Sequence, residues 1–254
     1  TFTPNGKYLL VANEGEPNTY NDFGSETNGP SIDPEGSVSI INLQRGVARA
    51  TVRTATFTAF NHATLDPSIR IFGPNATVAQ DLEPEYIAVS HDSKTAWVTL
   101  QENNALATID IRSATVKRLD GLGFKDHLLP QNGLDASDQD GGIHIANWPL
   151  QGVYMPDSIA ACRIGGKTHL VMANEGDTRV YPGYNEEARV SSLTLDPLAF
   201  PNAAELQQSN QLGRLVISKA GSDPDNDGDV DVLYSLGGRS FTIRTVKGEL
   251  VWDS

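Results

Sequence analysis

An internal repeat is the feature of this sequence that most limits the folds open to it. Three segments share one pattern, in which a polar turn and a lysine precede an apolar strand that ends on an amide and a glutamate. The segments are residues 5–16, 93–104 and 165–177, and they contain Glu14, Glu102 and Glu175 at matching places. Self-similarity of this kind indicates one supersecondary unit that is stacked several times along the chain.

Further strands are expected beside each copy of the repeat. Alternation of apolar and polar residues, which is typical of half-buried strands, occurs at residues 36–43, 85–90, 105–111 and 157–161. The resulting order of strand, turn, strand, short loop and strand is that of a propeller blade followed from its inner to its outer edge. The sequence therefore predicts an all-β fold of the β-propeller type, and residues 241–254 are expected to begin a partial fourth blade.

The spacing of the repeats predicts long insertions between the blade strands. A blade needs only about 40–45 residues, so the surplus is expected in the connections 16–35, 58–82, 123–152 and 178–212, with a short helix at residues 202–208. We interpret residues 1–254 as a single β-propeller domain that covers roughly three to four blades and is truncated at both ends. Because propellers have about 4–8 blades, another chain is a candidate to complete the ring.

The charge of the chain limits its partners. Its 32 acidic and 19 basic residues give a formal net charge of −13. Such a surface repels the phosphate backbone, so nucleic acid is not an expected partner. Acidity suits divalent cations, although it also serves solubility alone. Since no apolar run approaches the roughly 18 residues of a membrane-spanning helix, no membrane span is expected.

A loop with five aspartates is the sharpest motif in the sequence. Asp223, Asp225 and Asp227 alternate along it, Gly228 permits a sharp turn, and the list of candidate ligands is completed by Asp229 and Asp231. Ca²⁺ prefers six to eight oxygen ligands, which this spacing can supply as the backbone curls. An EF-hand would carry glutamate where this chain has Tyr234, so the pattern predicts a calcium site in a β-loop. The alternative is a solvated acidic turn, which mutual repulsion of the aspartates disfavours.

Carboxylates at strand ends form a second group of candidates. They are Glu14, Glu83, Glu85, Glu102, Asp157 and Glu175. Inner strands line the channel of a propeller, so these side chains could hold a second metal ion or a substrate there. In the alternative interpretation they bond backbone N–H groups at blade turns. Residues 135–142 are a further acidic stretch, but their spacing is irregular for a metal site.

The sequence also resembles a known family, the choice-of-anchor I proteins. The resemblance rests on residues 12–18, 33–37, 81–86, 100–105, 134–138, 154–157, 173–179 and 237–241. This family includes bacterial secreted proteins that are often labelled alkaline-phosphatase-like and mesenchyme-specific cell-surface glycoproteins of biomineralising animals. The resemblance implies a seven-bladed type of propeller, an extracellular, cell-surface or periplasmic location, and a role linked to calcium.

Two functions remain open at this point. The first is a calcium-binding module for adhesion, matrix or mineral contact. The second is a metal-dependent phosphomonoesterase that acts on a phosphate or phosphoester, with the strand-end carboxylates as metal ligands. In that case Glu175, Asp157 and Arg179 are the catalytic candidates, with Arg179 holding the phosphate.

Overall fold

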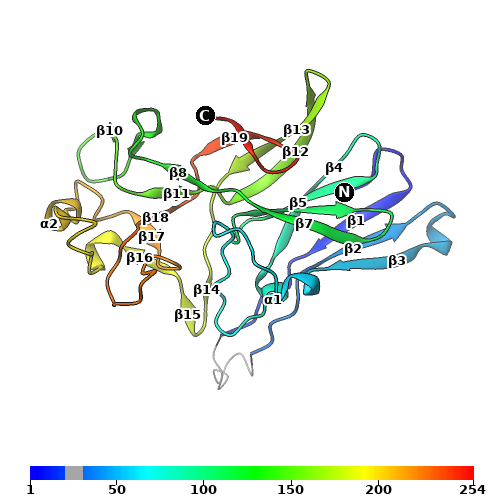
Figure 1. Cartoon of the computed structure of the whole chain (residues 1–254), viewed down its shortest axis with the longest axis horizontal. Helices are drawn as coiled ribbons and strands as arrows, with labels where there is room; N and C mark the ends of the chain where they lie inside the picture. Colours follow the sequence, from blue (N-terminus) through cyan, green and yellow to red (C-terminus); the bar gives the residue numbers. More distant parts are fainter. Residues whose placement is uncertain (21–30) are drawn as a thin grey trace.

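Three antiparallel sheets form the framework of the fold. A computed structural model describes residues 1–20 and 31–254 (Figure 1), so part of the predicted connection 16–35 lies outside the described residues. The first sheet consists of β1 (Tyr8–Asn13), β2 (Ser37–Asn42) and β3 (Thr51–Thr56). The second consists of β4 (Pro84–Val89), β5 (Thr95–Leu100), β6 (Ala105–Asp110) and β7 (Thr115–Gly121). The third consists of β12 (Pro156–Ile164), β13 (Lys167–Asn174), β19 (Ser240–Thr245) and β20 (Leu250–Asp253).

The second sheet is a complete four-stranded blade. Its strands pair in chain order, β4-β5-β6-β7, and each is antiparallel to its neighbour. The turn from β5 to β6 is tight because Asn104 adopts a φ of 52°, a left-handed conformation that asparagine tolerates. The side-chain amide of Asn104 donates to the Gly123 carbonyl at 2.9 Å, which fixes the turn against the following segment.

The sheets are stacked face to face through two apolar cores. Leu10 of the first sheet and Val98 of the second belong to one core, and Trp97 of the second and Met172 of the third belong to the other. Neighbouring side chains in a strand point to opposite faces, so Trp97 and Val98 bury both faces of the second sheet. Such stacking of up-and-down sheets confirms the predicted all-β fold of the β-propeller type.

The prediction of a partial fourth blade at residues 241–254 is wrong. These residues form β19 and β20, and β19 pairs with β13 from His169↔Thr245 to Asn174↔Ser240. They are therefore the outer half of the third blade. Their separation from the inner half by the insertion 175–239 hides this pairing from the local pattern.

The predicted insertions contain structure of their own. Residues 124–236 contribute a five-stranded mixed sheet of β8 (Phe124–Asp126), β11 (Gln151–Val153), β16 (Glu187–Arg189), β17 (Val216–Ser218) and β18 (Tyr234–Leu236). Within it β11 and β18 are parallel. Beside it lies a separate apolar core that includes Leu212, Ile217 and Leu233. These insertions thus form a second packed body (Figure 1), where the sequence suggested loops.

The remaining elements are short. Two-stranded pairs are formed by β9 (Leu134–Asp135) with β10 (Ile145–Ala146) and by β14 (Val180–Tyr181) with β15 (Tyr184–Asn185). The helices are α1 (Val78–Asp81), α2 (Ala203–Leu206) and the 3-10 turns η1 (Val47–Arg49), η2 (Thr58–Phe60), η3 (Pro130–Asn132) and η4 (Val190–Ser192). The helix expected at residues 202–208 is therefore present as α2. None of the helices in the described residues has the length and apolar character of a membrane span.

The core between the second and third sheets provides a test of this stacking. Leu106 has no exposed surface there, so Leu106→Ala should lower the free energy of unfolding by about 2–5 kcal/mol. Leu198→Ala is the control, since this leucine is 90% exposed and its truncation should change stability by less than about 0.5 kcal/mol. Chemical denaturation measures both values, and equal losses in the two variants would contradict the stacked arrangement.

Candidate functional site

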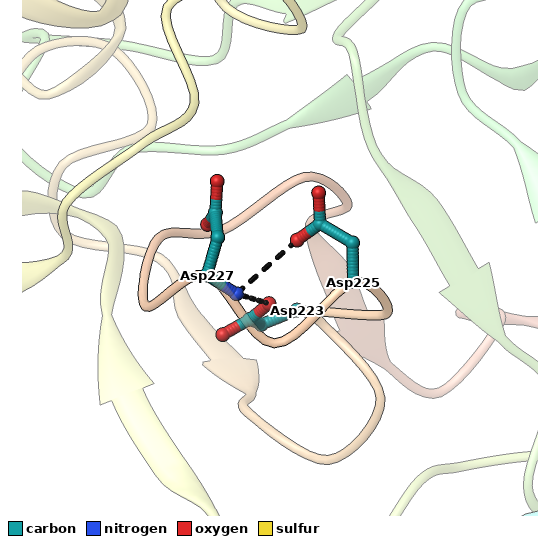
Figure 2. A group of neighbouring side chains, drawn as sticks. All are labelled: Asp223, Asp225 and Asp227. Carbon is teal, nitrogen blue, oxygen red and sulfur yellow. Dashed lines mark hydrogen bonds between the residues drawn. The ribbon is translucent and has the colours of Figure 1, made fainter.

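The aspartate loop lies between β17 and β18 and is curled around its own carboxylates. One carboxylate oxygen from each of Asp223, Asp225 and Asp227 lies within 4.8 Å of the other two (Figure 2). The backbone N–H of Asp227 donates to Asp223 at 3.2 Å and to Asp225 at 3.3 Å. Gly228, with a φ of +100°, donates its N–H to the second Asp223 oxygen at 3.1 Å. The predicted ligands at the first, third and fifth positions therefore converge.

Asp229 and Asp231, the other two predicted ligands, each have one oxygen without a hydrogen-bond partner. Asp229 Oδ1 and Asp231 Oδ2 are shielded from solvent and have no hydrogen-bond partner. Desolvation and then repulsion from Asp227 raise the pKa of the Asp229 carboxyl, while desolvation and then repulsion from Asp225 do so for Asp231. A cation among these oxygens would remove both the repulsion and the unmet hydrogen-bonding capacity.

Asp196 is a neighbour of the loop that the sequence analysis missed. The N–H of Val230 donates to the Thr194 carbonyl at 2.9 Å, and the N–H of Asp196 donates to the Val230 carbonyl at 3.0 Å. Asp196 is consequently close enough to repel Asp229 and Asp231 and to raise the pKa of both. Asp196 lies far from the loop in the sequence, so the local spacing of aspartates could not reveal it.

Strand-end carboxylates from all three stacked sheets gather at one end of the framework. Glu83 and Glu85 flank Pro84, which pairs with Leu100 just before Glu102. The Thr99 hydroxyl donates to the main-chain carbonyl of Asp157 at 3.3 Å and links the third sheet to this place. We call Glu14, Glu83, Glu85, Glu102, Asp157 and Asp177 the rim cluster.

Glu14 joins the rim cluster through a close backbone approach. A Cβ atom at Gly36 would lie 1.9 Å from the Leu82 carbonyl oxygen and 3.0 Å from that of Glu14, so only glycine fits between them. Glu175 lies at the end of β13 with its side chain exposed. Asp177 was absent from the sequence candidates, yet its charge acts on both Glu85 and Glu102.

Burial dominates the electrostatics of the rim cluster. It raises the pKa of Glu85 to about 8, with added repulsion from Glu102 and Glu14. Burial likewise raises the pKa of Glu102 to about 7 and that of Glu83 to about 8, although Arg179 acts in the opposite direction on both. Without a bound cation, a large fraction of these carboxyls is therefore protonated at neutral pH, and shifted carboxyls of this kind are frequent at functional sites.

Arg179 is held in buried ion pairs and has 1% of its surface exposed. Its guanidinium pairs with Asp81, lies 3.1 Å from Glu83 Oε2 and has its central carbon 4.5 Å from the Phe72 ring centroid. Burial lowers the pKa of Arg179, but the negative charges of Asp81 and Glu83 raise it by more, so the net shift of this pKa is upward. A phosphate bound by Arg179 would have to displace these carboxylates.

The acidic stretch 135–142 differs from the aspartate loop because two of its carboxylates have basic partners. Asp138 forms an ion pair with Arg214, and Asp140 lies 2.8 Å from His144. Within residues 1–20 and 31–254, Asp223, Asp225 and Asp227 are the group that brings three carboxylate oxygens close enough to hold a metal ion.

Stacked blades with acidic loops and strand ends define the protein as an all-β propeller-type protein with candidate cation sites. The chain belongs to the choice-of-anchor I domain family, whose model matches residues 1–254. Family membership indicates a surface-anchored or secreted protein. No curated protein matches the chain.

Two solved structures have some similarity to the chain. One is the hydrazine synthase of Kuenenia stuttgartiensis, at 12% identity and a TM-score of 0.30, with 99% of this chain and 47% of that chain covered. Another is the Cps50 (Swd1) β-propeller domain of Myceliophteria thermophila, at 11% identity and a TM-score of 0.25, with coverage of 72% and 69%. The chain spans about half the length of the hydrazine synthase chain.

The Arg179 ion pairs predict a large stability difference between two arginine substitutions. Arg179→Gln should cost about 3–5 kcal/mol, because Asp81 and Glu83 would be left buried without their counter-charge. Arg214→Gln removes an exposed ion pair with Asp138 and should have little measurable effect. Urea unfolding of both variants measures the difference, and a mild effect of Arg179→Gln would show that the pairs are not structural.

The raised pKa values predict how stability depends on pH without metal ions. Between pH 4.5 and about 8 the folded chain binds protons at Glu83 and Glu85 more tightly than the unfolded chain does. Stability from these groups is therefore full below pH 4.5 and is lost as the pH rises through about 8. The denaturant midpoint measured in chelator should therefore fall as the pH rises over this range. Glu102→Gln should make this fall smaller, because the charge of Glu102 helps to raise the pKa of Glu83 and Glu85. A midpoint that rises throughout the range would contradict the shifts.

Proposed function

We propose that this chain is a calcium-binding module of a secreted or cell-surface protein, with Ca²⁺ held by the loop 223–231. The observation that carries the proposal is the convergence of Asp223, Asp225 and Asp227 within 4.8 Å. The unpartnered oxygens of Asp229 and Asp231 support it independently, since they offer further hard ligands on the same short loop.

The chemistry of the loop suits calcium better than most other metals. The five aspartates of the loop offer carboxylate oxygens, which favour hard cations over zinc or copper. Ca²⁺ accepts six to eight oxygens in flexible geometry, so the loop carboxylates can be joined by backbone carbonyls and water. Backbone N–H groups already hold the Asp223 carboxylate in place, which lowers the cost of ordering the site.

A role in adhesion, matrix or mineral contact is the function we propose for this module. The net charge of −13 makes the surface attractive to calcium ions and to surfaces that display them. Calcium bound at an exposed loop can both order that loop and offer open coordination positions to an acidic partner.

A metal-dependent phosphomonoesterase is the second candidate function. The gathering of six carboxylates in the rim cluster favours it, because such enzymes hold metal ions with carboxylates. Arg179 weighs against it, because its guanidinium is buried against Asp81 and Glu83. Hydrolysis of an aryl phosphate that is abolished by chelator and by Glu102→Gln would establish this function, and full activity in that variant would reject the rim carboxylates as its metal ligands.

Isothermal titration with calcium tests the loop directly. The double variant Asp225→Asn/Asp227→Asn should bind one calcium ion fewer than the wild-type chain, because two of the three converging carboxylates become neutral. Calcium should also raise the Tm of the wild type, since a ligand that binds only the folded state stabilises it. Glu205→Gln in α2 removes an exposed carboxylate outside the loop, and this control should bind calcium as the wild type does. Unchanged stoichiometry in the double variant would refute the assignment.

A further inference from the structure

The rim cluster contains buried carboxylate oxygens that nothing in the described structure satisfies. Glu102 is 7% exposed and Glu83 is 2% exposed. Glu102 Oε2 and Glu83 Oε1 are both inaccessible to solvent and have no hydrogen-bond partner. Only the second oxygen of Glu83 is engaged, by Arg179. Burying a charged oxygen without a partner is costly, so these carboxyls are stabilised either by a proton or by a cation that replaces it.

Arg179 cannot neutralise the cluster. Its single positive charge is shared between Asp81 and Glu83, which already carry two carboxylates. Glu102 lies within range to repel Glu83 and Glu85, and Glu14 and Asp177 act on both Glu85 and Glu102. When its carboxyls are ionised, the cluster therefore carries more negative charge than Arg179 can balance.

Hydrogen bonds from the Thr99 and Asn103 side chains hold the backbone of the rim cluster in position. The Thr99 hydroxyl lies 3.5 Å from the Tyr86 carbonyl oxygen and 3.3 Å from that of Asp157, so it joins the starts of β4 and β12. The Asn103 side chain accepts from the Glu83 N–H at 3.1 Å and donates to the Asp81 carbonyl at 2.8 Å. Ligand groups supported by hydrogen bonds in this way are preorganised, whereas side chains on an unsupported acidic surface are flexible.

We propose that the rim cluster is a second divalent-cation site, in which Glu102 and Glu85 bind the ion and Glu14, Asp157 and Asp177 act through retained water. This site is separate from the loop 223–231 and does not depend on it. The close three-oxygen group found in the described residues is at that loop, so the rim ion takes fewer direct carboxylates. An ion with one or two carboxylates and several waters is the usual arrangement of Mg²⁺ in proteins, and Ca²⁺ accepts it too.

Metal counting in three forms of the whole chain tests the proposal. Wild type, the loop variant Asp225→Asn/Asp227→Asn and the rim variant Glu102→Gln are stripped with chelator and dialysed against MgCl₂ or CaCl₂, and bound metal is measured by mass spectrometry. We expect two ions in the wild type with at least one of the salts, and one in each variant with the same salt. The Glu205→Gln control should retain both ions.

The outcomes separate this site from the loop site. A single ion in the wild type that is lost in Glu102→Gln alone would support the rim site and overturn the loop site. A rim variant that keeps the wild-type number of ions would overturn the rim site. Circular dichroism checks that Glu102→Gln is folded; if it is not, Glu85→Gln takes its place with the same expected loss of one ion.

Discussion

Burial of the second sheet on both faces is the constraint on which the rest of the framework depends. Val98 faces the first sheet and Trp97 faces the third, so a single strand supplies both cores. Removal of either neighbour would expose one of these apolar faces to water, at about 25 cal/mol for each Å². The ends of the strands are fixed by the same stacking, and the rim carboxylates lie at those ends. The chemistry of the rim thus follows from the packing of the blades.

The repeat predicted the strands correctly, but the glutamates at the strand ends are not in equivalent environments as the repeat suggested. Leu10 and Val98 both lie four residues before the glutamate of the repeat, yet Leu10 points from the first sheet toward the second and Val98 points back. A one-residue change of register reverses every side chain of a strand. Glu102 is accordingly buried while Glu14 is exposed. Glutamates at matching positions of the repeat therefore have different environments in the folded chain.

Distance along the chain decided which parts of the candidate sites could be predicted from sequence. The loop 223–231 contains all of its proposed ligands within nine consecutive residues, so local spacing was enough to find it. Asp196 approaches that loop only because the segment beside it pairs with Val230. Asp81, the partner of Arg179, lies about a hundred residues away in the chain, and the pairing of β19 with β13 crosses a long insertion.

Both acidic clusters lie outside the apolar faces of the sheets, and this separation has an energetic consequence. Repulsion among the carboxylates opposes folding, but it acts on a loop and on strand ends, where it does not interrupt the stacked cores. A cation that binds either cluster would convert that repulsion into attraction and would stabilise the folded chain by mass action. Extracellular calcium modules commonly bind at about 10⁻⁴–10⁻³ M, so a surface protein with such sites gains stability in the medium where it works. The aspartates and glutamates that weaken the metal-free fold would then make its stability depend on the surrounding ions.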